Sequence, residues 1–375
     1  MYFSDPFDRH YQASITRTAS HRQHTQAFKM GDVRQTIKQS LPVDVNKPYD
    51  PSTLKHKTIL ITGGANGLGA HMVRHWASHG ANIVIGDVAD KAGEELVASL
   101  RMAHPKGVFE FQHCDVTDWE SQVSLFDTAV KASPHGSIDI VVPNAGIILP
   151  GEATKFENPD LVNGKLPEPN TATLDVNVKG VIFTVHLALY HLPQNKRPDR
   201  CFLFVGSVAS LIPLPGQSHY CMSKHAVLGL FRSMRGTAFL KGIRINMIAP
   251  YYIAQTKMLQ PITEALLLSG SAGPGQVPDV VDAATRLIAD ESIVGRALVV
   301  GPRLKPQDFE VGDNGSGLLG TEDQNQAQAI WECYAHDFDQ VETFVKRYLW
   351  LLNAAARARG MLAWIRDIMA IWKRG

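Results

Sequence analysis

Short apolar runs alternate along the chain with stretches in which apolar residues recur at helical spacing. The runs are rich in β-branched residues and predict buried strands. They lie at Thr58–Thr62, Asn82–Gly86, Val108–His113, Ile138–Val142, Cys201–Val205, Gly242–Ala249 and Arg296–Val300. The helical stretches include 68–79, 172–192, 218–240 and 279–289. This alternation predicts βαβ units, and therefore an α/β fold with a doubly wound parallel sheet and helices on both faces.

The alternating pattern covers residues 51–303, where we expect a single domain. Residues 1–50 are polar with few aliphatics and predict an N-terminal extension, partly disordered or draped on the body. Residues 304–375 predict a C-terminal extension that ends in a basic amphipathic helix. That helix either packs on the body or a partner subunit, or makes peripheral membrane contact through 345–374. We favour packing, because amphipathic periodicity first indicates a face that meets a core.

Composition narrows the class of protein. The 375 residues carry a net charge of +1, which gives no electrostatic basis for binding nucleic acid. We find no uninterrupted apolar run of about 18 residues that predicts a membrane span, and no apolar leader in the first thirty residues. The four cysteines have no paired spacing, and no cluster has metal-ligand spacing. We therefore expect a cytoplasmic protein with free thiols and no metal, membrane-associated only if the C-terminal helix binds lipid.

A glycine-rich turn follows the first predicted strand. It contains Gly63, Asn66, Gly67, Leu68 and Gly69, and a helix begins within it. Glycines allow a tight turn and close approach of the backbone, and a helix N-terminus offers free N–H groups to a pyrophosphate. Glycine also marks ordinary turns, but here a strand precedes and a helix follows, as a dinucleotide site requires.

Two acidic residues stand at the ends of the next strands. Asp87 lies about 20 positions beyond the glycines, where a carboxylate accepts hydrogen bonds from an adenosine ribose. It would repel a 2′-phosphate, and no Lys or Arg stands beside it, so we expect NAD as the cofactor and NADP as the less favoured one. Asp115 has two interpretations. It could bind the adenine amino group, or it could cap the helix that starts near Trp119.

The pair Tyr220 and Lys224 has the spacing that places two side chains on one helix face. A free tyrosine has a pKa of about 10. We expect the Lys224 ammonium to lower the pKa of Tyr220, which would let the phenol exchange a proton with an alcohol or carbonyl. Ser207 follows the strand Cys201–Val205, at the strand end where ligands bind in open parallel sheets. Taken alone, the Tyr–Lys pair also fits an ordinary amphipathic helix.

Together these segments resemble the short-chain dehydrogenase/reductase family, in its compact single-domain branch with a Rossmann-type fold. The matches, in the family's order, are TGGANGLG at 62–69, Asp87, CDVT at 114–117, NAG at 144–146, DVNVKG around Asn177, Ser207, Tyr220 and Lys224. They span residues 54 to about 303. Within the family the chain resembles fungal enzymes related to 15-hydroxyprostaglandin dehydrogenase and 5′-hydroxyaverantin dehydrogenase.

The resemblance implies that Ser207, Tyr220, Lys224 and Asn177 are catalytic. Asn177 would hold a water between its backbone and Lys224, continuing a proton relay from Tyr220 to solvent. Lys224 would also bind the nicotinamide ribose. Beyond the glycine turn and Asp87, the dinucleotide would contact Asp115, Val116, Asn144, Ala145, Gly146, Tyr220, Lys224, Pro250 and Ile253. The helices near 172–192 and 218–240 would form the interface of a homodimer or homotetramer.

Three positions depart from the family pattern. Tyr251 replaces the glycine that usually follows Pro250, and Thr256 comes six residues after that proline, where the family places a threonine five after it. The usual role of that threonine is therefore not carried over to Thr256. Pro143 replaces the usual first Asn of the segment before Asn144, which should alter hydrogen bonding at the sheet edge and not the chemistry.

The expected activity is NAD-dependent oxidation of a lipophilic secondary alcohol to a ketone, or the reverse, in fungal secondary metabolism or on an oxidised lipid. The apolar residues of the predicted lid 255–278 suggest the lipophilic substrate, although they could merely cover the core. A non-catalytic NAD-binding sensor or scaffold is the main alternative, and the complete Ser-Tyr-Lys set counts against it. A sugar-nucleotide epimerase shares the Tyr–Lys chemistry but normally needs a larger substrate domain.

Overall fold

The computed structural model describes residues 39–253, 273–305 and 327–334, with the single positions 265, 348, 351, 354, 358, 360 and 361. Contacts divide the chain after Gln35, and all the described residues belong to the second unit, 36–375. Three predicted segments lie largely outside the described residues: positions 1–38 of the extension predicted over 1–50, most of the predicted lid and most of the basic C-terminal helix.

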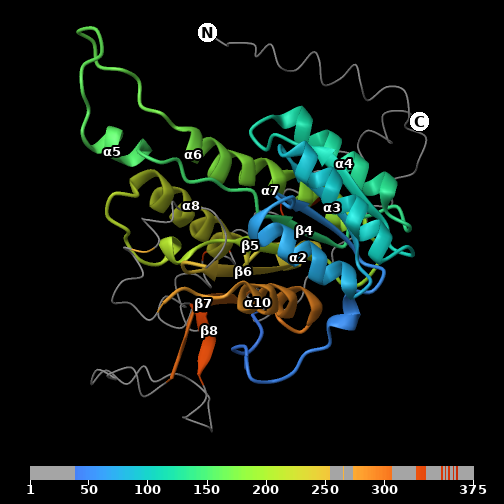
Figure 1. Cartoon of the computed structure of the whole chain (residues 1–375). Helices are drawn as coiled ribbons and strands as arrows, with labels where there is room; N and C mark the ends of the chain where they lie inside the picture. Colours follow the sequence, from blue (N-terminus) through green and yellow to red (C-terminus); the bar gives the residue numbers. More distant parts are fainter. Residues whose placement is uncertain are drawn as a thin grey trace. The chain divides into compact units, whose positions relative to one another are not determined.

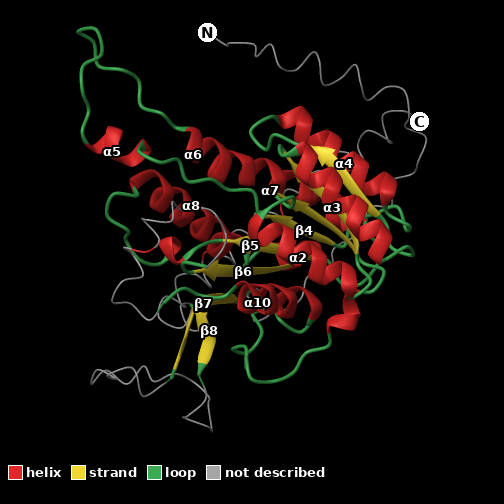
Figure 2. Cartoon of the chain, viewed as in Figure 1, coloured by secondary structure: helices red, strands yellow, loops and turns green. Residues whose placement is uncertain are grey.

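A single mixed sheet forms the centre of the described unit (Figures 1 and 2). Its strand order is β3-β2-β1-β4-β5-β6-β7-β8. The strands are β1 (Thr58–Thr62), β2 (Asn82–Asp87), β3 (Phe109–His113), β4 (Ile140–Pro143), β5 (Cys201–Val205), β6 (Arg244–Pro250), β7 (Ala297–Leu304) and β8 (Gln328–Cys333). Neighbours pair in parallel except β7 and β8, which are antiparallel. The predicted α/β fold of Rossmann type is confirmed.

Helices cover both faces of this sheet (Figure 2). The helices are α2 (Gly67–Ser78), α3 (Asp90–Ala103), α4 (Trp119–Ala132), α5 (Glu152–Glu157), α6 (Ala172–Leu174), α7 (Gly180–His191), α8 (Ser218–Met234) and α10 (Val277–Ala289). Apolar side chains of α2, α3 and α10 form one core cluster with the sheet, and those of α4, α7 and α8 form the other. The strands β1, β5 and β6 are mostly apolar because they are buried along their whole length.

The strand order reverses between β1 and β4, and this position creates the ligand crevice. From β1 the chain proceeds outward to β2 and β3, then crosses back to β4 on the other side of β1. The loops that follow β1 and β4 therefore leave the sheet in opposite directions. Open α/β sheets bind ligands in the crevice that opens there, at the carboxyl ends of the strands.

The predicted helix over 172–192 is interrupted. After α6 the backbone makes a π-helical turn, η4 (Asp175–Lys179), before α7 begins, and η5 (Leu192–Gln194) ends the run. Residues 172–194 are long and apolar enough to cross a membrane by length and composition. Val181, Val185 and Ala188 of this run are buried in the core cluster beneath the sheet, so we interpret it as a core helix.

Strand β8 was not predicted from the sequence. It pairs with β7 from Ala297 to Val300 and extends the sheet beyond the last predicted strand. Glu332 of β8 forms an ion pair with Arg296 (3.2 Å) and accepts a hydrogen bond from the backbone N–H of Val43 (2.5 Å). This bond holds Val43 against the edge strand of the sheet.

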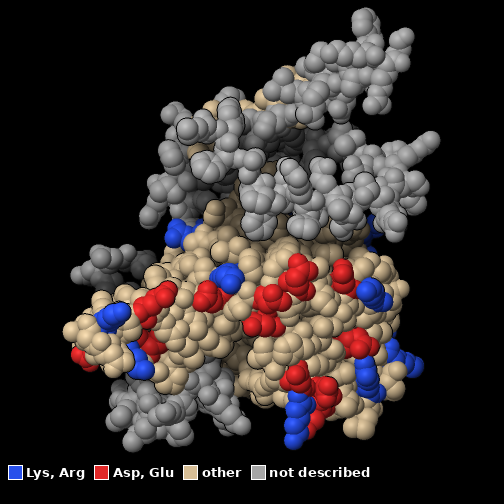
Figure 3. Space-filling view, turned by 90° about the horizontal axis from the view of Figure 1, so that it is seen from above, with Lys and Arg blue, Asp and Glu red and all other residues tan. Residues whose placement is uncertain are grey.

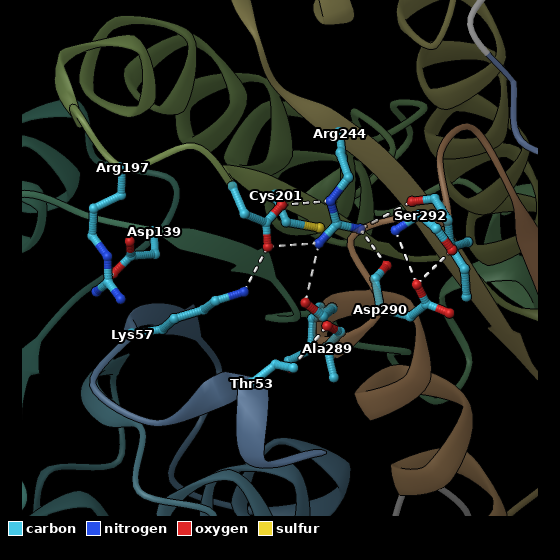
Figure 4. A network of polar contacts seen from close by, with 12 residues as sticks. Thr53, Lys57, Asp139, Arg197, Cys201, Arg244, Ala289, Asp290 and Ser292 are labelled. Carbon is cyan, nitrogen blue, oxygen red and sulfur yellow. Dashed lines mark hydrogen bonds and ion pairs between the residues drawn. The ribbon is translucent and has the colours of Figure 1, made fainter. Parts of the chain in front are cut away.

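A buried ion cluster joins the amino ends of three strands (Figure 4). Asp199, just before β5, receives Lys57 Nζ at 2.6 Å and two nitrogens of Arg244 at 2.6 and 3.0 Å. The Arg244 guanidinium also donates to the carbonyl oxygens of Leu287, Ile288, Asp290 and Ile293, at the end of α10. One arginine therefore satisfies the terminal carbonyls of a helix while it fixes β6 beside β5.

Candidate active site

A cavity of about 420 Å³ opens at the carboxyl ends of the strands. All the residues predicted to be catalytic or to bind the dinucleotide line this cavity, except Asn177. The structure therefore brings together segments that are more than 180 residues apart in sequence, from Gly63 to Ile253. Their roles remain predictions, but their convergence on one cavity is a structural fact.

The glycine turn after β1 is shaped for close approach of a ligand. Gly63 has φ +64, and a Cβ there would lie 2.6 Å from the Cα of Ala145. A Cβ on Gly69 would overlap the carbonyl oxygen of Gly63. Asn144 Nδ2 donates to the carbonyl oxygens of Thr62 (3.1 Å) and Gly63 (2.6 Å) and so ties the turn to the end of β4. The start of α2 faces this narrow cradle, which fits the pyrophosphate of a dinucleotide.

The Asp87 carboxylate is fixed by two backbone hydrogen bonds. Oδ2 accepts from the N–H of Ala65 in the glycine turn (2.9 Å), and Oδ1 accepts from the N–H of Ala89 (3.0 Å). Each carboxylate oxygen has a second lone pair for another donor. The group lines the cavity as an oriented acceptor beside the turn, which is the position that a ribose hydroxyl would need.

Asp115 does not cap α4, so that interpretation is wrong. Asp118 is the N-cap, and its side chain accepts from the N–H of Ser121. Asp115 Oδ1 instead accepts from the N–H (2.9 Å) and hydroxyl (2.8 Å) of Thr117, which closes a local turn. The residue is exposed at the cavity, and contact with an adenine amino group stays a prediction.

Ser207 lies two residues beyond β5, in extended backbone with φ −164. Its hydroxyl donates to the carbonyl oxygen of Pro250 at 3.3 Å and accepts from the N–H of Ala209 at 3.2 Å. Burial raises the pKa of Tyr220, a hydrogen bond with Ser207 opposes that rise, and the nearby Tyr252 phenol adds to it. Among the described residues, Ser207 is the group that favours the phenolate of Tyr220.

The effect of Lys224 on the pKa of Tyr220 differs from the sequence prediction. Its Nζ donates to the carbonyl oxygen of Val205 at 3.2 Å and lies 5.7 Å from the centroid of the Tyr220 ring. Burial lowers the pKa of Lys224 to about 8. The expected lowering of the Tyr220 pKa by Lys224 is not seen: burial raises the pKa of Tyr220, and the group that opposes this rise is Ser207.

Asn177 occupies the π-helical turn η4 and is 1% exposed, so the solvent-facing alternative is wrong. Its Nδ2 donates to the carbonyl oxygen of Ile147 (2.9 Å) and to Ser223 Oγ (3.1 Å), and its Oδ1 accepts from the N–H of Ile147 (2.8 Å). These bonds join the segment after β4 to α8, next to Lys224. Single π-turns inside α-helices often occur at functional sites. The water relay through Asn177 stays a prediction.

Residues that sequence analysis did not assign to the site also line the cavity. They are Val88, Cys114, Ile147, Ile148, Val176, Val205, Gly206, Val208, Leu214, Gln217, Tyr251 and Tyr252. For Tyr251 a sequence feature was available, because a bulky ring replaces the family's usual glycine there. Thr256 lies outside the described residues.

Comparison with known proteins gives a consistent result. The short chain dehydrogenase family matches residues 57–267, more than half of the chain. The chain is 32% identical over 273 residues to 5′-hydroxyaverantin dehydrogenase of Dothistroma septosporum, covering 69% of this chain and 88% of that protein. The enzyme with the same name in Emericella nidulans is 36% identical over 283 residues (70% and 88%). A protein of a Phoma species named NADP-dependent dehydrogenase M3 is 33% identical over 291 residues (72% and 84%).

The family match, the parallel sheet and the cavity that gathers the glycine turn with Ser207, Tyr220 and Lys224 all lead to one conclusion. The chain belongs to the short-chain dehydrogenase/reductase family and is an NAD(P)-dependent oxidoreductase that acts on CH–OH groups.

Proposed function

We propose that the protein uses NAD to oxidise a lipophilic secondary alcohol to a ketone, or catalyses the reverse reduction. The observation that carries the proposal is the placement of Ser207, Tyr220 and Lys224 in the same cavity as the glycine cradle. A substrate hydroxyl between Ser207 and Tyr220 would lie beside the segment after Pro250, where the nicotinamide is expected.

The chain's own residues handle the proton. Ser207 donates a hydrogen bond to the substrate oxygen, where charge changes during the reaction, and such donors contribute strongly to rate. Tyr220 takes the hydroxyl proton, and Lys224 holds the nicotinamide ribose. Asn177 orders a water that returns the proton to solvent. A bound nicotinamide supplies the hydride acceptor.

Asp87 supports the preference for NAD. The Ala65 and Ala89 backbone bonds hold its carboxylate toward the cavity, where its charge opposes a 2′-phosphate. The Phoma relative has NADP in its name, so the two cofactors must be compared directly.

The substrate half of the cavity supports a lipophilic substrate. Its lining includes Ile147, Ile148, Val208 and Leu214, and the amide of Gln217 is a neutral polar group among them. Two relatives are named for oxidation of 5′-hydroxyaverantin, which is consistent with a role in fungal secondary metabolism.

We further propose that α7 and α8 form a homodimer or homotetramer interface. Ile182 and Tyr190 of α7 and Met222 of α8 are large apolar residues that are more than half exposed. Light scattering of the full chain tests this proposal. A dimeric or tetrameric mass that Ile182→Lys reduces would support it, and a monomeric mass for the unaltered chain would contradict it.

The test of function is the appearance of NADH absorbance with a panel of secondary alcohols. NAD and NADP are compared in parallel, and Tyr220→Phe serves as the matched control because it removes a single oxygen. Turnover with NAD that is lost in the control is the expected result. Retained turnover in Tyr220→Phe would contradict the role of Tyr220. Binding of NAD by calorimetry, with no turnover of any alcohol, would favour a non-catalytic sensor or scaffold.

A further inference from the structure

Two consecutive tyrosines stand where β6 reaches the cavity. Tyr251 and Tyr252 follow Pro250 directly, and both line the cavity with Ser207 and Tyr220. The carbonyl oxygen of Pro250 accepts the hydrogen bond of the Ser207 hydroxyl at 3.3 Å. The aromatic pair therefore begins one residue from a group that contacts the catalytic serine.

Hydrogen bonds fix the backbone of this pair on both sides. The N–H of Tyr251 donates to the carbonyl oxygen of Val300 in β7 (2.7 Å), and the carbonyl oxygen of Tyr252 accepts from the N–H of Gly275 (2.7 Å). A Cβ on Gly275 would lie 2.7 Å from Ile253 Cδ1, so the backbone at Gly275 approaches Ile253 as closely as glycine allows. The two rings pack edge to face, with centroids 5.5 Å apart and an interplanar angle of 82°.

The Tyr252 phenol also lies near the reacting groups. Ionisation of one of these two phenols disfavours ionisation of the other, and Tyr252 therefore raises the pKa of Tyr220. Burial raises the pKa of Tyr252 itself, so this phenol is neutral at physiological pH. The wall it forms is thus aromatic and uncharged, and the same cavity is also lined by the apolar residues Ile148, Val208 and Leu214.

We propose that Tyr251 and Tyr252 are specificity-determining residues that select alcohols bearing a flat aromatic ring beside the carbinol carbon. This inference rests on the proposed function. An ordered ring pair offers its faces and edges to another aromatic ring at low entropic cost, whereas a saturated ring of the same size is too thick to stack. A pocket that selects by hydrophobic burial alone would instead prefer the substrate with the saturated ring, which has the larger apolar surface.

The test uses the full chain saturated with NAD, the oxidised cofactor with which a ketone cannot react, and two matched ketones, 2-acetylnaphthalene and 2-acetyldecalin. We expect the naphthyl ketone to bind about tenfold more tightly, as one or two aromatic contacts would give. Equal binding, or tighter binding of the decalin ketone, would overturn the inference. This measurement needs no substitution, so it does not depend on a variant that folds.

Substitutions then assign the preference to the ring pair. Tyr252→Leu and Tyr251→Leu should reduce the naphthyl preference severalfold, while Tyr252→Phe, which keeps the ring, should retain it. A preference that survives both leucine variants would overturn the inference, as would one that Tyr252→Phe abolishes as fully as Tyr252→Leu. Melting temperature and NADH binding show that each variant is folded.

Turnover of the two corresponding alcohols separates this inference from the proposed function. Equal kcat/KM for 1-(2-naphthyl)ethanol and 1-(2-decalinyl)ethanol, with equal ketone binding, would contradict selection by Tyr251 and Tyr252. The same result would still support the dehydrogenase function. A tenfold binding preference without turnover of either alcohol would support the wall and count against the proposed function.

Discussion

The hydroxyl of Ser207 donates a hydrogen bond to the carbonyl oxygen of Pro250, 3.3 Å away, and so joins the ends of β5 and β6 at the cavity. Its single O–H can instead rotate toward Tyr220, where a hydrogen bond lowers the pKa of that phenol against the effect of burial. A single side chain thus positions the strand end that carries the aromatic pair and adjusts the acidity of the expected base.

Replacing Ser207 should therefore change the pH dependence as well as the rate. Ser207→Ala removes the hydrogen bond that lowers the pKa of Tyr220, so that pKa should rise. The rising limb of kcat/KM for alcohol oxidation should move to higher pH, because the phenolate then forms less readily. The rate should fall by about 10²–10³, as for loss of a donor to a reacting oxygen. A lower rate with no shift in the pH profile of kcat/KM would contradict the effect of Ser207 on the pKa of Tyr220.

Lys224 should lower the free energy of unfolding of the protein at neutral pH. Its pKa is about 8 in the folded protein, lowered by burial from 10.5. Between those values the unfolded chain binds more protons, so folding stability from this group rises as pH increases from about 8 to 10.5 and is reduced below 8. Lys224→Met should raise the free energy of unfolding at pH 7 by about 1–3 kcal/mol while abolishing turnover.

Urea unfolding of both proteins across this pH range checks the sign. The advantage of Lys224→Met should shrink as the pH rises above 8, because the unaltered protein then regains stability. An advantage that does not vary with pH would show that packing, and not the buried charge, accounts for it.

Asp87→Asn should shift cofactor use toward NADP. The substitution removes a negative charge and keeps an acceptor oxygen for one of the two N–H bonds from Ala65 and Ala89, while the other oxygen becomes an NH2 group. Repulsion between close charges near a protein surface is worth about 1–4 kcal/mol, so the ratio of kcat/KM for NADP over NAD should rise about tenfold or more. Asp90→Asn is a nearby control, since that carboxylate contacts His113 on the surface. An equal shift in the control would indicate a general field effect.

Arg244→Met should destabilise the fold. It leaves Asp199 with Lys57 as its remaining ion partner and removes one donor from each of four carbonyl oxygens in and after the last turn of α10. Breaking a buried pair by removing one partner typically costs about 3–5 kcal/mol. Urea unfolding measures the loss, with Arg74→Met as control, because Arg74 is exposed and makes one surface hydrogen bond. A loss no larger than in the control would contradict the role assigned to the cluster.

Much of the fold and the site was predictable because the deciding features are local. Buried parallel strands are continuous apolar runs, and β1 and β5 have the predicted bounds. The glycine turn is recognisable because positive φ and close approach exclude side chains at Gly63 and Gly69. These features need no knowledge of residues far away in the chain.

What could not be predicted depends on distant partners. Asp199 pairs with residues 45 and 142 positions away, and nothing near it in sequence indicates either partner. Asn177 is buried because a π-turn rotates it toward Ile147, a change that helical periodicity does not reveal. Surface charge is a separate matter. On the face seen from above in Figure 3, acidic and basic side chains of the described residues are interspersed.

Strand β6 is buried along its whole length, with Arg244 at its first residue and Pro250 at its last. The ion cluster that stabilises the fold therefore lies at the first residue of β6, and the ring pair proposed to select the substrate follows its last residue. Positions 251 and 252 become natural targets for laboratory evolution, because new substrate ranges can be sought there without disturbing the ionic anchor. In the same way, substitutions at these two positions offer relatives of this enzyme a route to new substrates that leaves the ion cluster at Arg244 unchanged.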